Sequence, residues 1–69
     1  MKAIKSYGYT VKAPKRMLKE VKKNMQDKRC CINWFNFFVG DMFYTDNGNY
    51  RVNIADHENR TIQFINKRR

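Results

Sequence analysis

Residues 42–66 read MFYTDNGNYRVNIADHENRTIQFIN, and their pattern of apolar and polar residues predicts most of the sheet. Apolar and polar residues alternate within this stretch, and polar clusters at Asp46–Asn49 and Asp56–Asn59 interrupt the alternation. Alternation with a period of two is typical of a half-buried strand. The pair Asn47–Gly48 favours a tight turn, because both residue types accept a positive φ. The stretch therefore predicts a meander of three antiparallel strands.

Upstream of the meander, the period of the apolar residues changes. Apolar residues recur there at helical spacing: Met17, Leu18, Val21 and Met25. Pro14 suits the first turn of a helix, so we predict a helix over residues 14–28 with one apolar face. Residues 2–11 alternate instead with a period of two, which predicts a strand before the helix.

Between the helix and the meander, Cys30–Val39 is rich in aromatic and β-branched residues, which favour a strand. Gly40–Asp41 bends or breaks this strand before Met42–Thr45. Both of its alternating faces are apolar, so the strand needs cover on both sides or exposes an apolar patch. One helix covers one face of a sheet. We therefore expect an uncovered aromatic face.

Together these elements place the 69 residues in the α+β class, as a single domain with the order strand–helix–strand–strand–strand. We expect an antiparallel sheet with the helix packed on one face. A chain of this length buries only about 60% of the surface that its unfolded form exposes, so it holds one thin core. It leaves no room for a cofactor-binding fold, and we expect no cofactor.

Positive charge is concentrated toward the N-terminus. The chain has 15 Lys and Arg against 6 Asp and Glu, a formal net charge of +9. Ten basic residues against two acidic ones give residues 1–29 a net charge of +8, whereas residues 30–66 carry −2. The basic tail 67–69, which we expect to be mobile, adds +3. Such asymmetry usually marks a contact surface for a polyanion, although basic residues also serve to keep a small protein soluble.

Opposite its apolar stripe, the predicted helix presents a row of basic residues. Lysines give a salt-dependent, sequence-independent attraction to phosphates. The candidate nucleic-acid-binding residues are Lys12, Lys15, Arg16, Lys19, Lys22, Lys23, Arg51, Lys67, Arg68 and Arg69. The alternatives are a solvated helix face and an anionic membrane surface. The membrane is the weaker alternative, because the core needs the short apolar stripe.

A second candidate surface comes from the aromatic residues of Cys30–Val39. Its candidate partner-binding residues are Trp34, Phe35, Phe37 and Phe38. Exposed Trp and Phe side chains concentrate binding energy in protein interfaces, and aromatic rings also stack on unpaired bases. Ordinary core packing is the third interpretation, which we favour for the face under the helix.

Several function classes find no support in the sequence. No apolar run reaches the roughly 18 residues of a membrane span, and no apolar segment of a signal peptide follows Met1, so we expect a cytoplasmic protein without a membrane partner. Adjacent Cys30 and Cys31 are poorly placed to bridge, and with His57 they lack metal-site spacing, so we expect no metal. His57 is expected to be a solvated turn residue. No phosphate-binding glycine loop or hydrolase motif occurs, so we expect no catalytic residue.

The hairpin of the meander and the end of the chain share a set of positions with a known family: Gly48–Val52, Asp56, Glu58–Ile62, Phe64 and Lys67–Arg69. Together they resemble the C-terminal hairpin of the RelE/ParE toxin superfamily, whose members are small, basic α+β domains. In the RelE branch, basic sheet residues grip ribosome-bound message and a C-terminal aromatic residue assists cleavage. The resemblance implies that Arg51 and Arg68 contact RNA. Because one helix replaces the usual pair and the sequence ends before that aromatic segment, we expect binding without cleavage.

We therefore predict a small, non-enzymatic accessory protein that holds the phosphate backbone of DNA or RNA, in a style common among bacteriophage proteins. The leading alternative is an inhibitor or regulator that docks on a host enzyme through the aromatic surface, with the helix lysines against an acidic partner. A ribosome-dependent mRNA endoribonuclease, implied by the resemblance alone, is the third. A strand with two apolar faces makes a homodimer conceivable beside a monomer.

Overall fold

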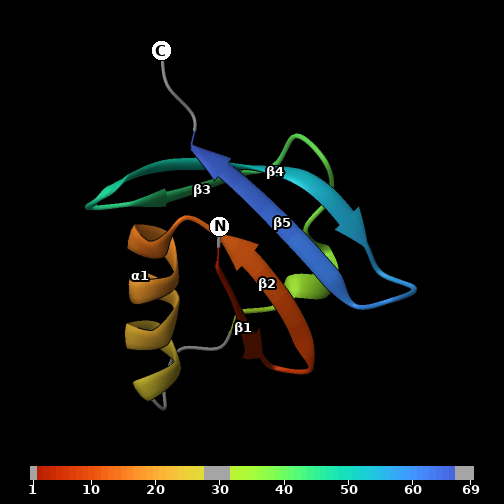
Figure 1. Cartoon of the computed structure of the whole chain (residues 1–69), viewed down its shortest axis with the longest axis horizontal. Coiled ribbons are helices and arrows are strands. Elements are labelled where there is room, and N and C mark those ends of the chain that lie inside the picture. Colours follow the sequence, from red (N-terminus) through yellow and green to blue (C-terminus); the bar gives the residue numbers. More distant parts are fainter. Residues whose placement is uncertain (1, 28–31, 67–69) are drawn as a thin grey trace.

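The computed structural model describes residues 2–27 and 32–66. Its elements, in chain order, are β1 (Lys2–Ser6), β2 (Tyr9–Ala13), α1 (Lys15–Gln26), the 3-10 helix η1 (Trp34–Asn36), β3 (Met42–Thr45), β4 (Gly48–Asp56) and β5 (Thr61–Asn66). The strands form one sheet in the order β1-β2-β5-β4-β3 (Figure 1). The chain is a small α+β domain, as the sequence predicts.

The meander is confirmed, and the sheet around it is mixed. Strands β3, β4 and β5 pair antiparallel in sequence order, with turns at the two predicted polar clusters. The expectation of a wholly antiparallel sheet is wrong, because β2 and β5 run parallel side by side. A parallel pair needs a long crossover connection, and α1 with the meander supplies it.

The prediction of one strand over residues 2–11 is wrong, because this stretch is a hairpin. Strands β1 and β2 pair antiparallel, and Ser6 lies opposite Tyr9. The two turn residues, Tyr7 and Gly8, have φ values of 48° and 84°. Positive φ at both central residues belongs to the tight turns that match the twist of a hairpin. Glycine adopts such a φ readily, whereas tyrosine rarely does, so the sequence signal for this turn is weak.

The predicted helix is confirmed, with slightly tighter bounds. The carbonyl oxygen of Pro14 accepts hydrogen bonds from the backbone N–H groups of Met17 and Leu18, which starts α1. The helix buries Met17, Leu18 and Val21 against β1 and β2, while Met25 near its end is 37% exposed. The expected apolar stripe is therefore the core-facing stripe over its first two turns.

The strand predicted for Cys30–Val39 is wrong in its described part, residues 32–39, which fold as a loop around η1. The side chain of Asn33 accepts a hydrogen bond of 3.2 Å from the backbone N–H of Phe35, and this bond starts the 3-10 turn. Residues Asn33 and Asn36, which interrupt the aromatic run, thus mark a turn in place of a strand. Cys30 and Cys31 lie outside the described residues.

The core lies on one face of the sheet and has two covers. Helix α1 covers β1 and β2. The loop of residues 32–39, which we call the aromatic loop, covers the meander. Trp34 is 1% exposed and packs its ring 6.0 Å from that of Phe43 and 5.8 Å from that of Phe64. The main strand contacts of α1 are with β1 and β2, so the helix leaves the meander side of the core uncovered. The aromatic loop therefore completes the cover of the core.

Candidate nucleic-acid interface

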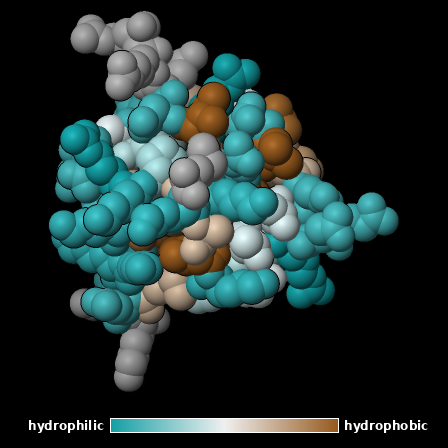
Figure 2. All heavy atoms as spheres, in the orientation of Figure 1, coloured by the Kyte–Doolittle hydropathy of each residue, from teal (hydrophilic) through white to brown (hydrophobic). Residues whose placement is uncertain are grey.

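A cleft between α1 and β1 is lined by four lysines and no acidic residue. We call it the basic cleft; its volume is about 290 Å³ and its lining is Lys2, Ala3, Ile4, Lys15, Leu18, Lys19 and Lys22. The three helix lysines are spaced i, i+4 and i+7, so they form one stripe along α1. Leu18 and Ile4 give the cleft an apolar floor. Figure 2 shows apolar atoms exposed beside α1 within a largely hydrophilic surface.

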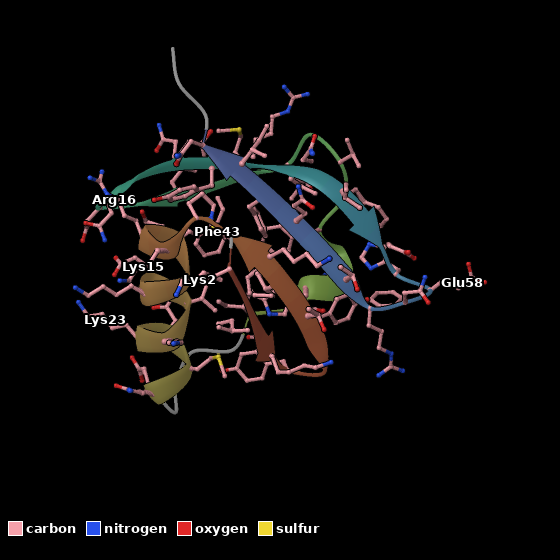
Figure 3. The ribbon with its side chains drawn as sticks, in the orientation of Figure 1. Lys2, Lys15, Arg16, Lys23, Phe43 and Glu58 are labelled. Carbon is pink, nitrogen blue, oxygen red and sulfur yellow. The ribbon has the colours of Figure 1, made fainter. Side chains whose placement is uncertain are left out.

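Lys2 is a site residue that the sequence analysis missed. It pairs with Ala13 at the end of the β1–β2 hairpin, and Ala13 is buried on the core face. Lys2 therefore sits on the same face of the sheet as α1, at its rim, where the basic cleft opens (Figure 3). The signal is hidden because a single strand over residues 2–11 would place Lys2 far from the start of the helix.

A second cleft, toward the β3–β4 turn, shares Lys19 and Lys22 with the basic cleft and has mixed charge. Its volume is about 520 Å³ and its lining is Lys19, Glu20, Lys22, Lys23, Gln26, Asp46 and Asn47. Asp46 and Asn47 come from the β3–β4 turn, which brings a carboxylate of the later hairpin toward the helix. Glu20 and Asp46 offset part of the lysine charge there. The positive potential is therefore least compensated around Lys2 and Lys15, which line the basic cleft and not the second one.

All five predicted basic residues of α1 are exposed: Lys15, Arg16, Lys19, Lys22 and Lys23. Within the described part of the chain, none of them makes an ion pair or a side-chain hydrogen bond. Lys15 with Lys19, and Lys19 with Lys23, are like charges at i, i+4 spacing, which costs a few tenths of a kcal/mol each, so about 0.5 kcal/mol for the two pairs. A bound anion would relieve this repulsion.

The two other candidate nucleic-acid-binding residues that the structure describes, Lys12 and Arg51, lie on the sheet face opposite to the one that α1 covers. Val11 points into the core, so its neighbour Lys12 points away from it. Arg51, between buried Tyr50 and Val52, does the same on β4. Lys12 and Arg51 lie opposite Gln63 and Ile65, two residues apart on β5, and Lys5 shares their face. Apart from Arg60 in the β4–β5 turn, the described cations thus form two groups on opposite faces. Lys67, Arg68 and Arg69 lie outside the described residues.

The predicted aromatic surface divides into buried and exposed residues. Trp34 is buried in the core, and its indole N–H donates a hydrogen bond of 2.9 Å to the hydroxyl of Ser6. Phe37 is half-buried against the core. Phe35 and Phe38 are 63% and 58% exposed. Two of the four predicted partner-binding residues are therefore accessible, on a loop where we expected a sheet face.

His57 is bonded on both ring nitrogens, so its description as a solvated turn residue is wrong. Nε2 lies 2.7 Å from the carbonyl oxygen of Phe37, and Nδ1 lies 2.7 Å from the hydroxyl of Tyr9. Because a carbonyl only accepts, Nε2 is the donor in the bond to Phe37, and Nδ1 makes the second hydrogen bond with the Tyr9 hydroxyl. These partners lie 20 and 48 positions away, so no local sequence signal reveals them.

Across the described ranges 2–27 and 32–66, no three His, Cys, Asp or Glu side chains converge to hold a metal ion. No helix among these residues is both long and apolar enough to cross a membrane.

No protein-family model matches the chain, and neither a curated protein nor a solved structure matches it. The relationship to the RelE/ParE superfamily stays a prediction. Of the two positions that the resemblance implies, Arg51 is exposed on the outer sheet face and Arg68 lies outside the described residues.

Proposed function

We propose that this protein binds the phosphate backbone of nucleic acid along α1 and β1, without chemistry. The observation that carries the proposal is the basic cleft, where Lys2, Lys15, Lys19 and Lys22 converge with no carboxylate in the lining. Four ammonium groups that share one cleft attract a chain of phosphates more strongly than four scattered ones, because their fields add within a Debye length of about 8–10 Å.

The apolar floor of the cleft refines the kind of contact. A phosphate near the lysines places the adjoining sugar against Ile4 and Leu18, whose side chains accept its apolar carbon atoms. Lysine is a point charge that selects phosphate without reading base edges. The binding is therefore sequence-independent, and its affinity comes mainly from the release of counterions.

Fluorescence anisotropy with a labelled duplex, titrated over a range of salt concentrations, tests the proposal. Four phosphate contacts give a slope of about −3.6 for log affinity against log salt, so affinity falls on the order of 100-fold between 50 and 200 mM salt. Replacing Lys15, Lys19 and Lys22 by Gln keeps good helix formers in α1, so the fold is retained. This triple variant should flatten the slope by about 2.7, or about 0.9 for each lysine replaced.

The opposite sheet face supplies a control with the same change in net charge. Replacing Lys5, Lys12 and Arg51 by Gln also removes three positive charges, all from exposed positions away from α1. We expect the slope to change by less than about one unit in this variant, because these residues do not touch the duplex in the proposed mode. A larger loss in this control than in the helix variant, or no duplex binding at low salt, overturns the proposal.

A further inference from the structure

The side chains of Phe35 and Phe38 are exposed to solvent on the aromatic loop, whose backbone is fixed by hydrogen bonds. Phe35, Phe38 and Val39 are 63%, 58% and 63% exposed. The rings of Phe35 and Phe38 lie 5.4 Å and 5.0 Å from the ring of His57, so the three rings form one continuous surface. We call these four residues the Phe35–Phe38 patch. Exposure of this kind leaves apolar area in water, and it needs an explanation beyond the fold.

The backbone under the patch is fixed by hydrogen bonds. The carboxylate of Asp41 accepts a bond of 2.8 Å from the backbone N–H of Phe38, and the backbone N–H of Asp41 donates one of 3.0 Å to the carbonyl of Phe38. Two backbone bonds, of 3.0 and 2.9 Å, tie Gly40 and Asp41 to Val52 of β4. His57 holds the carbonyl of Phe37 from the other side. The rings are therefore presented in a set geometry, which lowers the entropy lost on binding.

The charge around the patch is opposite in sign to the charge of α1. Asp41 lies beneath Phe38, and Asp56 and Glu58 flank His57 in the β4–β5 turn. Hydrogen bonds from the Asn59 side chain and backbone hold the Asp56 carboxylate. Arg60 of the same turn, whose guanidinium lies beside Gly8 of the β1–β2 turn, offsets one of these three negative charges, so the surroundings of the patch carry a net charge of −2. In Figure 3, Glu58 stands at the far end of the molecule from Lys15 and Lys23.

We propose that the Phe35–Phe38 patch is a docking surface for a protein segment that is apolar at its centre and basic at its rim. Aromatic side chains anchor protein interfaces, and complementary rim charges set the choice of partner. The acidic rim repels phosphates, which argues against base stacking on these rings. It also argues against a second copy across a two-fold axis, because that axis sets acidic rim against acidic rim. This inference goes beyond nucleic-acid binding and places the two binding surfaces at opposite ends of one small domain.

The experiment uses two synthetic amphipathic peptides, one of Leu and Lys and one of Leu and Glu, each titrated into ¹⁵N-labelled full-length protein. The Leu–Lys peptide should shift the amide signals of Phe35, Phe38 and His57, although protein and peptide are both positively charged overall. The Leu–Glu peptide should shift signals of α1 instead. Shifts of α1 by the Leu–Lys peptide, or shifts of the patch by the Leu–Glu peptide alone, overturn the proposal.

Alanine variants assign the binding to the rings. The double variant Phe35→Ala and Phe38→Ala should weaken Leu–Lys peptide binding by at least about 30-fold, the loss typical of an interface hot spot. Tyr44→Ala, which removes a 71% exposed ring from the opposite sheet face, is the matched control and should leave affinity unchanged. Glu58→Gln should weaken binding at low salt and have little effect at high salt, because its contribution is a screened rim charge.

The same double variant tests two other possible ligands of the Phe35–Phe38 patch, which are unpaired nucleic-acid bases and a second copy of this chain. Oligonucleotide affinity should be unchanged in it, and sedimentation should show a monomer for both wild type and variant. A loss of oligonucleotide affinity would assign the rings to base stacking, and a wild-type dimer dissolved by the double variant would assign them to self-association. Either result overturns the proposal. Thermal unfolding checks the fold of the variant, since substitutions at exposed positions change stability by at most about 0.5 kcal/mol.

Discussion

The indole N–H of Trp34 donates a hydrogen bond of 2.9 Å to the hydroxyl of Ser6, and both side chains are 1% exposed. This bond joins the aromatic loop to β1 across 28 positions of sequence. Ser6 is the buried polar residue of the described core. A serine at this position is therefore explained by the buried indole N–H of Trp34, which needs a hydrogen-bond acceptor.

Ser6→Ala should lower the free energy of unfolding by about 1–3 kcal/mol, because it leaves the indole N–H of Trp34 buried without a partner. Urea unfolding followed by tryptophan fluorescence measures the change. In a Trp34→Phe background, which has no N–H to satisfy, the same substitution should cost less. Equal costs in the two backgrounds would show that the hydrogen bond does not account for the loss. Lys5→Ala, on the exposed face of the same strand, should stay within about 0.5 kcal/mol of wild type.

His57 ties the β4–β5 turn to both the aromatic loop and β2. His57→Ala breaks the bonds to the Phe37 carbonyl and the Tyr9 hydroxyl, whereas Tyr9→Phe breaks one of them. At about 0.5–1.5 kcal/mol for each bond, the histidine variant should be destabilised about twice as much. Chemical denaturation of both variants and of their combination gives the coupling energy. If the two single losses simply add, the Tyr9–His57 bond does not contribute to stability.

Asp56 gives the fold a dependence on acid. The pKa of its carboxyl lies below the ordinary 3.8, first because the Asn59 side chain donates to it and second because the Asn59 backbone N–H does so too. A pKa that is lower in the folded state stabilises the fold above the unfolded value, and this contribution is lost as pH falls through the folded value. Stability should therefore decline in the acid range below about pH 4.

Asn59→Ala should raise the pKa of Asp56 toward its ordinary value and weaken this acid dependence. An NMR titration of the Asp56 side chain measures the shift directly. Asn53→Ala, at an exposed asparagine elsewhere on β4, should leave the titration unchanged. A titration curve for Asp56 that is the same with and without the Asn59 side chain would disprove its leading role.

The sequence predicts the helix and the meander well, because both depend on local patterns. The stripe of Met17, Leu18 and Val21 has helical spacing, and all three side chains are buried. The turn between β3 and β4 is centred on Asp46 and Asn47, one position earlier than the Asn47–Gly48 pair indicates, and Gly48 after it has the positive φ of 142° that glycine adopts readily. In each case, the residues that decide the element lie within a few positions of one another.

The aromatic loop could not be predicted in this way, because its structure is set by distant partners. Trp34 is held by Ser6, and Phe37 by His57. The sequence rightly indicates that one helix covers too little apolar surface. The prediction of an uncovered aromatic face is wrong because it treats the aromatic run as a strand of the sheet. In the structure, the aromatic run is a loop that itself covers part of the core. The same limit hides Lys2, whose place in the basic cleft depends on the Tyr7–Gly8 turn.

The two methionines of α1 offer a direct test of which face the helix buries. Met17 is fully buried in the core, and Met25, two turns later, is 37% exposed. Met17→Ala should cost about 2–5 kcal/mol, because it removes buried apolar atoms and leaves a cavity. Met25→Ala changes the same side chain in the same helix, and it should cost well under about 1 kcal/mol, since alanine is the best helix former and little buried area is removed. Urea midpoints of the two variants decide the matter, and similar losses would show that the helix packs on another face.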